Sequence, residues 1–259
     1  DCPPQCPDDA ATWTVAGDSS AFSGEFVWDS AALPPFANQQ YRIESRAIDA
    51  AGNLLSYSTA TFIWDSAQPV SVTTSVVHLS TRVTLSELHG TATDGTAVVG
   101  SQFANKVANV KIRIRRVSDA LCWDWIGSFG TDCTFPQTVA LAGASPNYTW
   151  SVTENLPPPN NTTGLVTGTS YHVNLQANDA AFNPQTAIAT TTFIFDNLAP
   201  ATTVTFPAPG GFHRSDALSI LIGTAQDFPA GMQQIRINLR DTLTGKWFDG
   251  VSSFTLAAE

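Results

Sequence analysis

Acidic and amide side chains recur at matching places along this chain, and their chemistry is that of oxygen ligands. Asp49 with Asn53, and Asp179 with Asn183, fall in loops that follow expected strands. Calcium takes six to eight oxygen ligands from carboxylates, amides and carbonyls. We therefore identify candidate calcium ligands at Asp49, Asn53, Asp65, Asp94, Asp179, Asn183, Asp196 and Asp227. The alternative is that Asp and Asn only shape turns, since no Asp-x-Asp-x-Asp-Gly run is present.

The four cysteines form two local pairs, Cys2 with Cys6 and Cys122 with Cys133. Neither pair has Cys or His neighbours at the spacing of a zinc site. Two disulfides in an exported protein are the prediction, and free structural thiols are the alternative. Asn-x-Ser/Thr triplets at Asn147, Asn160 and Asn161 are candidate glycosylation sites of such a protein.

Motifs for catalysis are missing from the sequence. None of the four histidines lies in a recognisable motif with Cys, Ser or a carboxylate, and no Gly-x-Ser-x-Gly, His-Glu-x-x-His or phosphate loop occurs. Paired carboxylates of a glycosidase would meet only in space, but no feature of the sequence indicates them. The sequence predicts a protein that is not an enzyme.

Charge and hydropathy exclude two classes of partner. The net charge is −10 and the pI about 4.6, whereas a nucleic-acid binder needs clustered Lys and Arg to contact phosphates. No apolar stretch of about 18 residues exists to form a transmembrane helix. We expect neither nucleic-acid binding nor membrane insertion by this segment.

These residues belong to a sequence that repeats itself. The stretch YRIESRAIDAAGN at 41–53 corresponds to YHVNLQANDAAFN at 171–183, 130 positions later. TFIWDSAQP at 61–69 corresponds to TFIFDNLAP at 192–200, and GTATD at 90–94 to GTAQD at 223–227. An alternating strand follows each GTA motif, VKIRIRR at 110–116 and IRINLR at 235–240.

The alternation in these stretches has a period of two residues, which is typical of strands with one buried face. No window carries a helical apolar stripe. Short strands separated by Gly, Pro, Asn and Asp predict an all-β protein made of sandwiches. Within this fold Tyr171 is expected to bond back to upstream backbone, and Trp28 and Trp150 to fill the core.

The order of the repeated pieces predicts the domain organisation. Residues 68–199 contain an early and a late part, and therefore one complete domain. Residues 1–67 contain only a late, C-terminal half, and residues 200–259 only an early, N-terminal half. Half a sandwich exposes core and strand edges. Either an adjacent repeat of a longer polypeptide completes each half, or the tail of one copy completes the head of the next. An arbitrary boundary is the remaining alternative.

The repeated pattern resembles the bacterial immunoglobulin-like repeats of large secreted surface proteins. It reads L-x-x-G-x-x-Y-x-V-x-x-x-A-x-D-x-A-x-N and then T-F-x-F-D-x-x-x-P, from Leu165 to Pro200. The resemblance implies tandem immunoglobulin-like sandwiches outside the cell or on its surface. The chain departs from the pattern at Phe182, where the family has Gly, and the first half lacks the Gly before Tyr41.

Fold alone does not fix function, since such modules serve as stalks, coats, filaments and spacers. We expect an extracellular fibre or surface filament whose partners are its own copies head to tail, or adjacent repeats. The alternative is an adhesin that binds surface glycans or proteins through its loops. The Cys122–Cys133 hairpin with Trp123 and Trp125 is the one loop rich enough in aromatic residues for that role. A spacer beside a catalytic domain is a third class.

Overall fold

Only strands, turns and loops occur in the part of the chain that the structure describes. This computed structural model describes residues 36–47, 49, 51–53, 58–95, 106–214 and 219–256. The predicted all-β class is confirmed for these residues. They contain no helix long and apolar enough to cross a membrane. The predictions for Cys2, Cys6 and Trp28 lie outside them.

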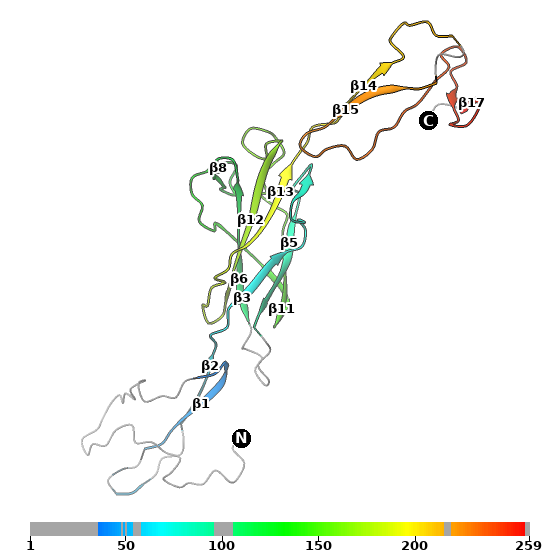
Figure 1. Ribbon diagram of the computed structural model, residues 1–259. Coiled ribbons are helices and arrows are strands. Elements are labelled where there is room, and N and C mark those ends of the chain that lie inside the picture. The colour runs from blue at the N-terminus through cyan, green and yellow to red at the C-terminus, as the bar shows by residue number, and fades with distance from the viewer. Residues whose placement is uncertain are drawn as a thin grey trace.

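Two larger sheets form a central unit (Figure 1). The first has the order β10-β11-β5-β3, and the second the order β4-β13-β12-β6-β7-β8, with β9 also paired to β6. The strands of the central unit are β3 (Pro69–Thr73), β4 (Ser80–Arg82), β5 (Leu88–Asp94), β6 (Val107–Arg116), β7 (Cys122–Trp123), β8 (Phe129–Gly130), β9 (Gln137–Val139), β10 (Leu141–Ala144), β11 (Asn147–Val152), β12 (Thr169–Asp179) and β13 (Ala189–Phe195).

Alternating residues of the two sheets build one core between them. Val110, Ile112 and Ile114 of β6 are buried, while Lys111 and Arg113 between them are partly exposed. Leu88 and Ala92 of β5 and Trp150 of β11 contribute from the first sheet. The predicted core position of Trp150 is therefore confirmed, and the arrangement is consistent with a β-sandwich.

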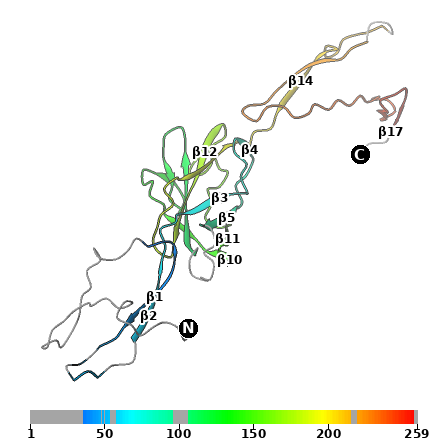
Figure 2. The ribbon, with the colours of Figure 1, turned by 60° about the horizontal axis from the view of Figure 1, so that its bottom comes forward.

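Smaller hairpins lie at opposite ends of the central unit (Figures 1 and 2). One consists of β1 (Gln39–Ser45) and β2 (Ser58–Trp64), and the other of β14 (Ala201–Phe206) and β15 (Ile222–Gln226). A further pair, β16 (Trp247–Phe248) and β17 (Phe254–Leu256), follows β15. All three are separate two-stranded sheets.

A tyrosine fixes the turn before β12, as the sequence predicts. The backbone N–H of Val166 donates to the hydroxyl of Tyr171 over 2.8 Å, and the ring is fully buried against Phe193. Tyr41 makes the same kind of bond, since the N–H of Ala37 donates to its hydroxyl over 2.8 Å. Each hydroxyl thereby accepts a hydrogen bond from a backbone N–H four or five residues upstream and holds that segment against the ring.

The turn after β12 keeps its left-handed backbone despite the aromatic residue in it. Phe182 has a φ of 69°, and the corresponding Gly52 in the first hairpin has a φ of 84°. A side chain in this region of φ/ψ space costs about 1–2 kcal/mol. The turn at Phe182 therefore keeps the left-handed backbone of the turn at Gly52 and carries this strain.

The Cys122–Cys133 disulfide closes a short loop beside the sheet edge, with the two residues 11 positions apart. Replacing both cysteines by alanine should lower the free energy of unfolding by roughly 3 kcal/mol, because the unfolded chain regains the entropy of that loop. Urea denaturation of the double variant and of the wild type measures the difference. Equal midpoints and slopes would contradict the expectation.

Candidate cation site at the first joint

Three of the predicted ligands meet where the first hairpin joins the central unit. Asp65 directly follows β2, Asp94 is the last residue of β5, and Asp179 is the last residue of β12. One carboxylate oxygen from each lies within 4.8 Å of the others. No second group of three or more His, Cys, Asp or Glu ligands occurs in the described ranges.

Asp94 is the member that most needs a partner. Its side chain is completely buried, and neither carboxylate oxygen has a hydrogen-bond partner. A buried charge without a partner costs several kcal/mol, so such groups are normally paired or coordinate a metal. The arrangement is therefore unfavourable unless a proton or a cation occupies it.

Asp179 is held in place by its own loop. The backbone N–H of Asn183 donates to Oδ1 over 2.7 Å, and the Asn183 side-chain amide donates to Oδ2 over 2.7 Å. The same amide nitrogen also donates to the backbone carbonyl of Asp65 over 3.0 Å. Asn183 thus orients one carboxylate and ties the end of the hairpin to the central unit.

Gln185 fastens the strands below the site. Its buried Oε1 accepts hydrogen bonds from the backbone and hydroxyl of Ser71 on β3, at 3.0 and 2.7 Å, and from the N–H of Ala177 on β12 at 3.2 Å. Its amide nitrogen donates to the carbonyl of Ala187 over 2.8 Å. These hydrogen bonds set the spacing between β3 and β12. The sequence did not predict this role for Gln185, because the residue lies in a stretch that looks like an ordinary turn.

Burial and the nearby carboxylates of Asp65 and Asp179 raise the pKa of Asp94 to about 7. Burial is the larger cause, because the charged form loses its hydration. The site therefore brings three carboxyl groups together, and Asp94 loses its proton less readily than an ordinary Asp. A divalent cation would neutralise them.

The donor set suits calcium. Two oxygens 2.3–2.6 Å from one Ca²⁺ are at most about 5 Å apart, and the three carboxylate oxygens lie within this span. All three donors are carboxylates, without the nitrogen or sulfur ligands that favour zinc or copper. Asp65, Asp94 and Asp179 would hold the ion, with Asn183 positioning Asp179.

The other predicted ligands do not join this group. Asp49 forms the same clamp as Asp179, receiving hydrogen bonds from the backbone and side-chain nitrogens of Asn53 at 2.8 and 2.6 Å, but its loop is exposed. Asp196 accepts hydrogen bonds from the hydroxyl of Thr167 and from the N–H of Ala230, at 3.1 and 3.0 Å. Asp227 is half-buried just after β15.

The aromatic residues of the disulfide hairpin are packed inward. Trp123 and Trp125 are buried, and the indole nitrogen of Trp123 donates to the carbonyl of Asn155 over 2.6 Å. They therefore form no exposed platform on which a sugar ring could stack. The exposed apolar side chain of this hairpin is Ile126.

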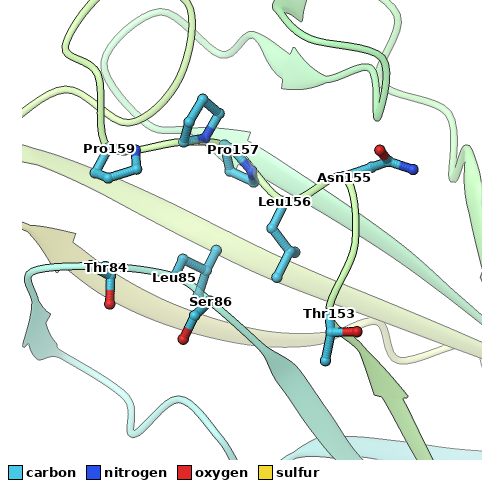
Figure 3. A pocket seen from close by; sticks show the side chains of 9 residues that line it. Thr84, Leu85, Ser86, Thr153, Asn155, Leu156, Pro157 and Pro159 are labelled. Carbon is cyan, nitrogen blue, oxygen red and sulfur yellow. The ribbon is translucent and has the colours of Figure 1, made fainter.

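A cleft of about 380 Å³ lies between the loop before β5 and the proline-rich loop after β11 (Figure 3). Figure 3 shows Thr84, Leu85 and Ser86 on one side and the run from Asn155 to Pro159 on the other. No lining residue is ionisable. The cleft thus supplies neither a general acid nor a general base.

The candidate glycosylation residues are all exposed. Asn147 begins β11, whereas Asn160 and Asn161 shape the proline-rich loop. Asn160 Oδ1 accepts from the N–H groups of Thr162 and Gly164, and Asn161 Oδ1 accepts from that of Thr167. Both loop residues therefore have a turn-forming role whether or not a glycan is attached.

Comparison of the chain with protein-family models and with curated proteins yields no match.

Calcium should stabilise the folded chain through Asp94. At a hundredfold excess over its Kd, a ligand of the folded state adds about 2.7 kcal/mol to the free energy of unfolding. Asp94→Asn should remove most of this gain, while Glu154→Gln, at an exposed carboxylate outside the group, should keep it. Thermal melts with calcium and with EDTA measure the effect, and equal gains in both variants would exclude this site.

Without calcium, the same carboxylate should make stability depend on pH. The folded pKa of Asp94 is about 7 against an ordinary 3.8, so the folded state binds more protons and stability falls as pH rises between these values. In EDTA above pH ~7, Asp94→Asn should be more stable than wild type, because the amide replaces a buried charge. Below pH ~4 the two should converge. Parallel curves from urea titrations would contradict the prediction.

Proposed function

We propose that this chain is a non-enzymatic structural module of an extracellular fibre or surface filament, built end to end from immunoglobulin-like sandwiches. The strand order of the central unit supports the choice of module. Sheets β3-β5-β11-β10 and β6-β12-β13 correspond to the ABED and CFG sheets of an immunoglobulin sandwich. The buried Tyr171 at the start of β12 occupies the place of the tyrosine corner.

The observation that carries the proposal is that parts of this module recur on both sides of it. Tyr41 lies opposite Phe62 in β1–β2 as Tyr171 lies opposite Phe193 in β12–β13. Both ring pairs have centroids 5.4 Å apart and planes at 22°. The recurrence of these parts on both sides of the central unit supports an array of such modules.

The second hairpin repeats the start of the module. Thr203 lies opposite Thr224 in β14–β15 as Val72 lies opposite Thr91 in β3–β5. A Cβ on Gly223 would meet the carbonyl of Thr203, and one on Gly90 the carbonyl of Val72. The same close approach of backbones thus recurs, which supports a further module beginning after residue 199.

The three clustered carboxylates at the first joint could stiffen the connection between neighbouring modules of an array. Small interfaces between domains allow them to move relative to each other. Asp65 comes from the end of one repeat, whereas Asp94 and Asp179 come from the next. A calcium ion bound by both would fix their relative orientation, and extracellular calcium sites typically bind at 10⁻⁴–10⁻³ M.

The disulfide supports a place outside the cytosol. Cys122 and Cys133 are joined in the structure, and such bonds persist in oxidising compartments. The low content of charged residues and the acidic pI are compatible with an exposed surface protein. Copies of the chain, or adjacent repeats, are then its natural partners.

Immunogold electron microscopy of the cells that produce the protein tests this function. An antibody raised against residues 68–199 should label fibres or threads on the surface at many points along their length, because the module repeats. Pre-immune serum is the control. Label confined to the cell interior, or to discrete surface particles, would refute the structural proposal and favour the adhesin or another role.

A further inference from the structure

The segment after β15 has the pattern of a core strand, but among the described residues it meets another strand only at its end, where Arg240 bridges to Trp247 of β16. Ile235, Ile237 and Leu239 are 56%, 63% and 43% exposed. Their counterparts Val110, Ile112 and Ile114 on β6 are all 0% exposed. The described part of the last repeat therefore leaves its central apolar row in contact with water.

Local geometry establishes this correspondence independently of the strand itself. Arg240 bridges to Trp247 as Arg115 bridges to Cys122. Asp249 accepts three backbone N–H bonds from residues 251–253, as Asp124 does from residues 126–128. Each counterpart is 125 positions later in the chain, so Leu239 corresponds to Ile114.

In the central unit, β12 pairs with the strand that carries this row and lies beside it in the same sheet. Val173 lies opposite Ile114, Leu175 opposite Ile112, and Ala177 opposite Val110. The first hairpin carries the counterpart of β12, and its Ile43 is 52% exposed whereas Val173 is 0% exposed. The C-terminal part of the chain thus exposes the counterpart of β6, and the N-terminal hairpin exposes the counterpart of β12.

We propose that residues 41–47 of a second copy add to residues 235–241 as an antiparallel strand, in the register of β12 on β6. This inference rests on the proposed function. The register sets Ile43 opposite Leu239, Ser45 opposite Ile237 and Ala47 opposite Ile235. Pairing within one chain is ruled out because the two segments lie at opposite ends of the central unit (Figures 1 and 2).

Aromatic packing fits the same register. In the central unit the ring of Phe129 lies 5.6 Å from that of Tyr171 and 5.3 Å from that of Trp123. The last repeat keeps the pair Phe248 and Phe254, 5.6 Å apart, without a tyrosine. Tyr41 of the second copy would supply the missing ring.

The joint between the central unit and the second hairpin lacks one of the three carboxylates found at the first joint, and a second copy carries its counterpart. Asp196 and Asp227 correspond to Asp65 and Asp94 of the first joint. Residues 200–256 contain no counterpart of Asp179 in its Asn-clamped loop. The Asp49–Asn53 loop has that geometry, and strand addition would carry it to this end.

On the solvent face the charges are not matched. The register sets Arg42 opposite Arg240 and Arg46 opposite Arg236, with Glu44 diagonally between the two partner arginines. Like charges in opposing positions are unfavourable. The apolar row and the backbone hydrogen bonds therefore provide the attraction, as in other strand additions.

Disulfide trapping between two full-length variants tests the register. Ile43→Cys in one copy and Leu239→Cys in another, distinguishable by a size tag, should form a mixed covalent dimer on mild oxidation, because directly opposite Cα atoms are within disulfide reach. Ile43→Cys with Ile235→Cys is the matched control, four residues out of register, and should give at least tenfold less dimer. All three sites are exposed in the isolated chain, and circular dichroism verifies folding.

Equal trapping in both pairs, or none in folded protein, would overturn the proposal. Sedimentation of the wild type gives a second measurement, since a chain that stays monomeric at high concentration also contradicts it. If surface fibres exist but no trapping occurs, the proposed function stands and a following repeat of the same polypeptide completes the half-domain. Trapping without surface fibres would instead refute the proposed function alone.

Discussion

The pairing of β6 with β12 is the interaction on which the rest of this structure depends. It joins an early and a late part of the sequence, and its inward residues are the centre of the core. Such long-range pairing costs the entropy of closing the loop between its strands, and apolar burial offsets that cost. A repeat that holds only one of these two strands cannot close its core.

The same pair positions the cation site. Asp179 ends β12, and the bulge between Asn178 and Asp179 turns the strand out of register with β6 at that point. Gln185 then bonds both β12 and β3, so the strand that enters from Asp65 is fixed against the strand that carries Asp179. The geometry of the joint is thus set by the core, and the carboxylates are held together against their mutual repulsion.

The sequence predicted the all-β class and the strands around Tyr171, because the alternation of apolar residues is a local property. The alternation in residues 110–116 reports one buried face, and the repeated Tyr and Phe mark the paired late strands. Asp65 was a candidate oxygen ligand at a joint, whereas Asp94 and Asp179 were candidates in two separate loops. The three carboxylates meet because of the way the strands are arranged in the fold. The residues next to each Asp in the sequence do not reveal that arrangement. Gln185 gave no signal, since a buried glutamine looks like any polar loop residue.

An interface made from a divided core differs physically from one made between finished surfaces. Surface contacts of ordinary size carry a polar rim and are partly exposed to water, whereas a completed sandwich buries its apolar row fully, as Val110 and Ile114 are buried here. Exposed strand edges invite indiscriminate pairing, and charges along the edge oppose it. Arg236 and Arg240 alternate with the apolar row of residues 235–239, so pairing at this edge depends on burial of that row and on backbone hydrogen bonds. Because the proposed donor and acceptor segments lie at opposite ends, each added copy would carry a new acceptor, and growth by this strand addition would be open and polar.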